Sequence, residues 1–134
     1  MNGRVWMVLA GLLGAVGVGM GAYASHGLGF IADAALREAM RATLQQAVQQ
    51  QLFHALALLG VGVLAQRAEA ATSRWLALSG LLFAVGVLLF SGLIYLRILG
   101  GVDSLRALVP WGGTSLILGW LALAVAGCKM PRSH

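Results

Sequence analysis

The chain has 134 residues, of which 60% are hydrophobic and only 10% are charged. This balance excludes a disordered chain and an ordinary water-soluble domain. The formal net charge of +5 is the balance of nine basic and four acidic residues. The basic residues are scattered singly, so we expect contact with anionic lipid headgroups rather than with nucleic acid.

Four apolar runs dominate the sequence, and each is long enough to cross a bilayer as a helix. A helix rises about 1.5 Å per residue and needs about 20 residues to cross about 30 Å of hydrocarbon. The runs cover residues 5–22, 48–65, 75–96 and 109–128, and none of them contains Asp, Glu, Lys or Arg. A 13.9 kDa soluble domain could not bury four such helices on all sides. We therefore predict a single integral membrane domain with spans at about 5–24, 48–66, 75–97 and 109–128.

The first apolar run resembles a secretory signal, because Arg4 precedes it and Ala22-Tyr23-Ala24 ends it like a cleavage site. Two features favour a retained span instead. The run is longer than a usual signal core, and it carries glycines at 11, 14, 17 and 21. Small residues at such spacings let helices approach closely. We expect Gly17 and Gly21 to face another helix.

Residues 33–47 are predicted to form an amphipathic helix that runs directly into the second span. Leu36, Met40, Leu44 and Ala47 fall on one helical face, and Asp33 is a suitable N-cap. We expect this helix to lie in the membrane interface. A solvated connecting helix is the alternative.

The positions of the basic residues predict the orientation of the spans. Arginine and lysine are more frequent in cytoplasmic loops. The side that holds both termini carries Arg4, Arg67, Arg74, Lys129 and Arg132, whereas the other carries Arg37, Arg41, Arg97 and Arg106. This small excess predicts that both termini are cytoplasmic.

Polar residues gather on the side opposite the termini, where spans one and two meet and spans three and four meet. Such residues are costly inside a bilayer, so their clustering needs a reason. The candidate ligand-binding residues are His26, Gln50, His54, Ser91 and Tyr95. His54 lies about six residues into the second span, and His26 is expected to reach towards it. The alternative is that they bond helices together, at about 1 kcal/mol or less per contact.

These residues do not predict a metal centre or an enzyme. A zinc site usually needs four protein ligands, or three and a water molecule, and no intramembrane carboxylate or cysteine lies near the two histidines. Haem bound by both histidines is chemically conceivable. No nucleophile, base and orienting group form a set. Trp120, in the middle of the last span, is expected to pack in the core. We therefore expect no metal, no cofactor and no catalytic residues.

The motifs in these spans resemble those of the YgdD-like family of small membrane proteins (domain of unknown function 423), whose animal relatives are the transmembrane protein 256 group. The sequence GAYASHGL is similar to that family's GAFGAHGL-type signature. The other motifs follow in the same order as AVQQQLFHALALL, GVLLFSGLIYL and PWGGTSLILGW. The resemblance covers all four spans.

The resemblance implies a four-helix inner-membrane protein without an established activity. The matching motif positions are Gly21, His26, Gly27, His54, Phe90, Ser91, Gly92, Tyr95, Pro110, Gly112, Gly113, Gly119 and Trp120. Among them, Gly92, Gly112, Gly113 and Gly119 are expected to pack helices. The chain departs from the family pattern at Gln50, where tyrosine is usual, and at Ser25, where glycine is usual.

We therefore expect an all-α fold: a bundle of four transmembrane helices with an amphipathic interfacial helix between spans one and two. The leading function is a non-catalytic accessory, assembly or homo-oligomeric component of the bacterial inner membrane. The expected partners are the lipid bilayer and either further copies of the chain or a larger membrane complex. The alternative is a small binding or transport protein for a lipid, a quinone or another amphipathic ligand near His26 and His54.

Overall fold

The computed structural model describes residues 2–131, and this range contains helices but no strand. The elements are α1 (Gly3–His26), α2 (Ala34–Ala65), α3 (Ala70–Val87), the π-helix η1 (Leu88–Gly92), α4 (Leu93–Gly100), the 3-10 helix η2 (Arg106–Leu108) and α5 (Val109–Cys128). The predicted all-α fold is confirmed.

Four helical segments are long and apolar enough to cross a membrane: Gly3–His26, Ala34–Ala65, Ala70–Gly100 and Arg106–Cys128. The third joins α3, η1 and α4 into one continuous span. These segments correspond to the four predicted spans. The third helical segment begins at Ala70, five residues before the start of the predicted span, so Ser73 and Arg74 belong to α3.

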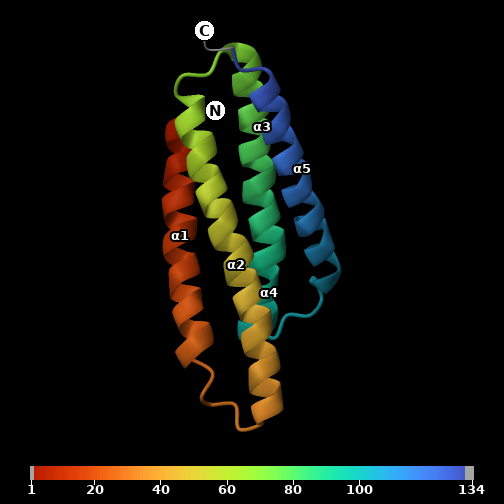
Figure 1. The fold of residues 1–134 in the computed structure, drawn as a ribbon. Helices are drawn as coiled ribbons and strands as arrows, with labels where there is room; N and C mark the ends of the chain where they lie inside the picture. Colours follow the sequence, from red (N-terminus) through yellow and green to blue (C-terminus); the bar gives the residue numbers. More distant parts are fainter. Residues whose placement is uncertain (1, 132–134) are drawn as a thin grey trace.

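The segment predicted as an amphipathic helix is the first part of α2. Asp33 caps it as expected, because its carboxylate accepts a hydrogen bond from the backbone amide of Leu36 at 3.0 Å. The helix then continues without a break for 32 residues, or about 48 Å at 1.5 Å per residue. In Figure 1, α2 extends in line past the ends of the other helices. Residues 33–47 thus run directly into the second span, and their position in the membrane interface stays a prediction.

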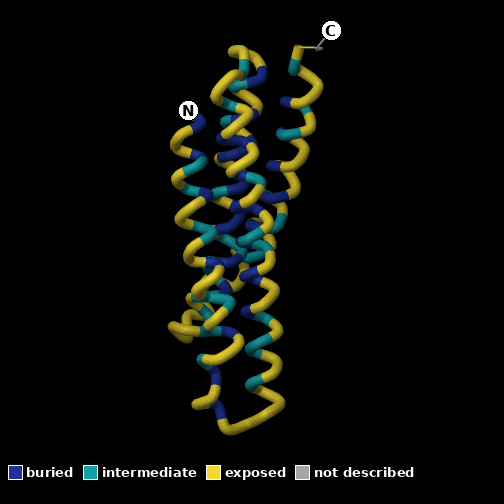
Figure 2. The backbone as a smooth tube through the Cα atoms, turned by 60° about the vertical axis from the view of Figure 1, so that its left-hand side comes forward, coloured by how far each residue is buried: buried dark blue, intermediate teal, exposed yellow. Residues whose placement is uncertain are grey.

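The bundle is organised around α2 and α3. Helix α1 packs along α2, and α5 packs along α3, so that α1 and α5 lie on opposite sides (Figure 1). Both described chain ends lie at one end of the bundle. Core side chains such as Trp6, Leu58, Leu76 and Phe83 are buried between the helices. Figure 2 shows buried segments along the interior and exposed segments on the outer faces. Large apolar side chains cover much of that outer surface, which suits contact with lipid.

Two glycines on α1 face α2, where the sequence expects helix packing. A Cβ atom added at Gly17 would lie 2.7 Å from the Cδ2 atom of Leu52. One added at Gly21 would lie 3.4 Å from Val48. A larger side chain at Gly17 would therefore push α1 away from α2.

The contact between α3 and α5 also depends on glycine. A Cβ atom at Gly112 would lie 2.5 Å from the backbone nitrogen of Phe90 and 3.0 Å from the carbonyl oxygen of Gly86. At Gly119 it would lie 2.6 Å from the ring of Phe83. Backbone atoms cannot move away as the end of a flexible side chain can, so the close approach of α5 to the third span at Gly112 requires glycine.

Gly92 and Gly113 do not lie at such close approaches. A Cβ atom at Gly92 would meet no other atom within 4 Å, and one at Gly113 would only reach the ring of Phe90 at 4.0 Å. The structure thus places two of the six expected packing glycines away from tight helix contacts.

Candidate functional site

The buried polar side chains lie at contacts between helices. In the part of the chain that the structure describes, they are Gln51, His54, Thr72, Ser79 and Ser91. Each takes part in a hydrogen bond within the bundle. This arrangement satisfies polar groups that no water molecule can reach in a bilayer.

Gln51 connects three helices. Its Nε2 atom donates a hydrogen bond to the carbonyl oxygen of Leu13 on α1 at 2.7 Å, and its Oε1 atom accepts one from the hydroxyl of Tyr95 on α4 at 2.7 Å. Nearby, the hydroxyl of Ser91 in η1 donates to the carbonyl oxygen of Ala47 on α2 at 2.7 Å. These bonds hold α1 and the η1–α4 segment against α2.

His54 connects α2 to α5. The Nε1 atom of Trp120 lies 3.0 Å from Nε2 of His54, and Nδ1 of His54 lies 2.7 Å from the carbonyl oxygen of Gln50. An indole N–H can only donate, so Nε2 accepts and Nδ1 carries the proton that is donated to Gln50. The ring of Phe83 completes an aromatic cluster, with centroids 5.3 Å from His54 and 5.1 Å from Trp120.

The His54–Trp120 pair lies near the middle of the bundle. Trp120 is eleven residues from the start of α5 and eight from its end, which corresponds to about 16 Å and 12 Å. His54 meets Trp120 from α2, where it lies eleven residues before the end of that helix.

The structure does not bring all the candidate ligand-binding residues together. His26 ends α1 with an exposed side chain, and it takes no part in the contacts of His54. Gln50 contributes its backbone carbonyl to His54. Ser91 and Tyr95 bond to α2 at positions other than His54. The predicted set therefore divides into separate helix contacts and one exposed histidine.

Two members of these contacts were not among the candidates. Gln51 follows the candidate Gln50, and the signal that could have revealed it is helical spacing: buried Ala47, Gln51, Ala55 and Leu58 share one face. Trp120 was expected in the core, but its side chain is 48% exposed. Its N–H is turned inwards, towards His54, and its ring contacts the buried ring of Phe83.

A second group of hydrogen bonds joins α3 to α5. Ser79 donates to the carbonyl oxygen of Gly119 at 2.8 Å, and Ser115 donates to that of Leu82 at 2.8 Å. Near the termini, the hydroxyl of Thr72 donates to the carbonyl oxygen of Lys129 at 3.0 Å. Each hydroxyl thus bonds the backbone of the neighbouring span.

Trp6 is an exception to this pattern. Its Nε1 atom is the one buried side-chain nitrogen or oxygen in residues 2–131 that has no hydrogen-bond partner. Its ring lies against Gly80 of α3, where an added Cβ atom would be 2.6 Å from the ring. Close packing of the ring over a glycine accounts for the position of Trp6.

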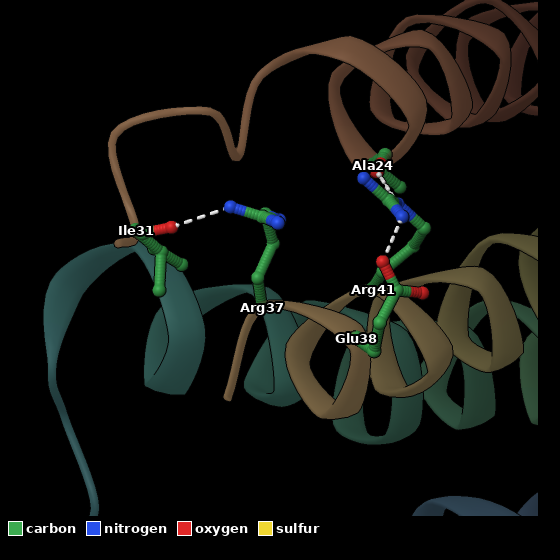
Figure 3. A network of polar contacts seen from close by, with 5 residues as sticks. All are labelled: Ala24, Ile31, Arg37, Glu38 and Arg41. Carbon is green, nitrogen blue, oxygen red and sulfur yellow. Dashed lines mark hydrogen bonds and ion pairs between the residues drawn. The ribbon is translucent and has the colours of Figure 1, made fainter. Parts of the chain in front are cut away.

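Two arginines close the connection between α1 and α2, as Figure 3 shows. Arg37 donates to the carbonyl oxygen of Ile31 at 2.8 Å. Arg41 donates to the carbonyl oxygen of Ala24 at 3.2 Å and forms an ion pair with Glu38. The carbonyl of Ala24 belongs to the last turns of α1, so Arg41 ties the end of that helix to α2.

The hollows of the bundle are of two kinds. An apolar groove of about 360 Å³ runs between α1 and α2 on the outer surface, and it is lined by Met7, Ala10, Gly11, Gly14, Leu52, Ala55, Leu56 and Leu59. A similar apolar groove lies between α3 and α5. At the end opposite the termini, two hollows are lined partly by charged residues, and Arg97 belongs to both. Within residues 2–131, no group of three or more His, Cys, Asp or Glu side chains is arranged to hold a metal ion.

Comparison with known proteins identifies the family. A family model described as "Protein of unknown function (DUF423)" matches residues 20–113. The chain belongs to this family. It is 33% identical to the UPF0382 membrane protein SAB0533 of Staphylococcus aureus over 94% of this chain and 97% of that relative. It is 32% identical to YwdK of Bacillus subtilis, over 94% of this chain and 98% of YwdK.

The name of a third relative states the membrane in which that relative lies. The chain is 29% identical to the UPF0382 inner membrane protein YgdD of Escherichia coli K12, over 98% of this chain and 95% of YgdD. No solved structure matches the chain. The protein is thus a multi-pass protein of the bacterial inner membrane, as its four spans and its relatives agree.

Proposed function

We propose that the protein is a non-catalytic structural component of the inner membrane that assembles with a second copy of itself along α1. The observation that carries this proposal is the use of its buried polar side chains. Gln51, His54 and Ser91 bond to neighbouring helices of the same chain. These groups stabilise the bundle and are not free to bind a substrate.

The hollow beside α1 and α2 also favours assembly over catalysis. A catalytic pocket usually combines an apolar wall with a few converging polar groups, whereas every side chain that lines this groove is apolar. The groove is open at Gly11 and Gly14, where an added Cβ atom would meet nothing within 4 Å. Small residues with open space beside them suit the close approach of another transmembrane helix.

Helix α1 is the span least covered by its own bundle. Only 17% of its apolar 18-residue window is buried, compared with 44% of that of α2. On another face of α1, exposed Val5, Val8, Leu12 and Val16 follow a helical spacing and are left to contact lipid. A groove that is open at Gly11 and Gly14 in each copy is self-complementary, so two copies related by a two-fold axis could pack α1 against α1 along this face. This supports a second copy as the occupant.

Disulfide cross-linking in native membranes tests the proposal. The variant Gly14→Cys, made in a Cys128→Ser background, places a thiol in the groove without a clash. The matched control is Ile117→Cys, on an exposed face of α5. We expect oxidation to give a product of twice the chain mass for Gly14→Cys but not for Ile117→Cys. A chain that stays monomeric, or that cross-links only to a different protein, would contradict assembly with a second copy.

The alternative function, a binding protein with a ligand between His26 and His54, receives no support at that place. His26 is exposed at the end of α1, whereas His54 is buried near the middle of the bundle. Both ring nitrogens of His54 already have partners. A ligand at His54 would have to displace Trp120.

A further inference from the structure

One of the two hollows that are lined partly by charged residues lies where α2, the η1–α4 segment and the start of α5 meet, opposite the chain termini. Its volume is about 350 Å³. Arg97, Arg106 and Gln46 provide polar groups, and Phe90 and Ile94 provide an apolar wall. A hollow with cations on one side and hydrocarbon on the other fits a ligand with an anionic head and an apolar tail.

The two arginines of this hollow differ from the two that close the α1–α2 connection. Arg37 and Arg41 bond to carbonyl oxygens and to Glu38 (Figure 3). In contrast, no hydrogen bond or ion pair engages the guanidinium of Arg106 within residues 2–131. Arg97 has one long ion pair, in which its Nε atom lies 3.7 Å from the carboxylate of Asp103, a highly exposed residue. Positive charge is therefore left at the hollow.

The depth of the hollow matches the length of a lipid headgroup and the start of an acyl chain. Arg97 lies in the last turn of α4, three residues before the end of the third candidate span. Phe90 is seven residues earlier in the same span, or about 10 Å deeper at 1.5 Å per residue. A phosphate between Arg97 and Arg106 would thus have its acyl chains beside Ile94 and Phe90.

We propose that this hollow binds the phosphate headgroup of an anionic phospholipid. Guanidinium groups form paired, charge-assisted hydrogen bonds with phosphate oxygens, and basic pockets between transmembrane helices suit anionic headgroups. The Gln46 amide is a further donor, whereas the hydroxyl of Thr43 already donates to the carbonyl oxygen of Ala39. The apolar wall distinguishes a lipid from a free anion, which would gain nothing from Phe90.

Native mass spectrometry of the purified protein in mild detergent tests the site with phosphatidylglycerol and phosphatidylcholine as probes. We expect phosphatidylglycerol to bind more tightly. A basic residue near an anionic headgroup is worth roughly fivefold in affinity, so Arg106→Gln should reduce the preference by about that factor and the double variant with Arg97→Gln should remove most of it. Arg106 has no partner to lose, so its variant should fold normally.

The matched control is Arg74→Gln, which removes the same charge from an exposed position at the opposite end of the bundle. We expect it to leave the preference unchanged. Equal binding of both lipids by the wild type, or an equal loss in Arg74→Gln and Arg106→Gln, would contradict the site. Displacement of phosphatidylglycerol by inorganic phosphate would indicate a free-anion site and would overturn the assignment to a lipid.

Discussion

At the scale of single residues, the contact between His54 and Trp120 shows how a polar group can be kept in the middle of a membrane. The indole N–H is turned inwards to Nε2 of the histidine, while much of the tryptophan ring faces outwards. The other ring nitrogen bonds to the carbonyl of Gln50, one turn earlier on the same helix. Because both nitrogens have partners, the histidine has no unpaired polar atom in the apolar interior.

This contact predicts the effect of Trp120→Phe, which keeps an aromatic ring but removes the donor. Hydrogen bonds between membrane helices contribute about 0.5–2 kcal/mol, so we expect the free energy of unfolding in detergent to fall by about that amount. His54→Ala should also destabilise the bundle, and the double variant should lose less than the sum of the two. Trp111→Phe, at a largely exposed position, is the control and should have little effect. Additive losses would show that the two side chains are not coupled.

At the scale of elements, the π-helix η1 sets the path of the third span. Within Leu88–Gly92 the chain leaves the regular α-helical pattern, and the backbone of Gly112 on α5 lies directly against this segment. Ser91 in the same turn bonds to the carbonyl of Ala47 on α2. The irregular turn therefore contacts two neighbouring helices at once.

The neighbouring pair Gly112 and Gly113 tests this packing. Gly112→Ala would place a methyl group 2.5 Å from the backbone nitrogen of Phe90, and overpacking costs roughly 1–3 kcal/mol. Gly113→Ala meets only the ring of Phe90 at 4.0 Å, so its thermal stability in detergent should stay close to that of the wild type. If both variants unfold at the same temperature, the backbone of α5 does not approach η1 closely at Gly112.

A similar comparison on α1 tests its contact with α2. Gly17→Leu should destabilise the bundle by roughly 1–3 kcal/mol, because the side chain would enter the space of Leu52. Gly19→Leu, where an added Cβ atom meets nothing within 4 Å, should be tolerated. If the Gly17→Leu variant is as stable as the wild type, this face of α1 contacts lipid and not α2.

The sequence predicted the spans better than the contacts between them. Apolar runs without charges specify transmembrane helices directly, because length and hydropathy suffice. The π-helix was not predicted, since Leu88–Gly92 is as apolar as its surroundings and contains no proline. The buried amide is that of Gln51 and not that of the candidate Gln50, and the partner of His54 lies 66 residues away. Such pairings depend on how the spans pack, which a sequence pattern does not contain.

At the scale of the whole molecule, four crossings place both described chain ends at the same end of the bundle (Figure 1). The side that faces the cytoplasm is a prediction from the basic residues. We expect Ser104→Cys, but not Ala70→Cys, to react with a membrane-impermeant thiol reagent added to intact cells, in a Cys128→Ser background. Labelling at 70 and protection at 104 would reverse the orientation.

The central claim is that the buried polar groups hold one chain together and that α1 then pairs two chains. The most direct test is the mass of the protein extracted from its own membrane in mild detergent. We predict twice 13.9 kDa, with any bound lipid lost in Arg97→Gln/Arg106→Gln and not in His54→Ala. A single chain that carries a stoichiometric small molecule, released by His54→Ala, would contradict the account.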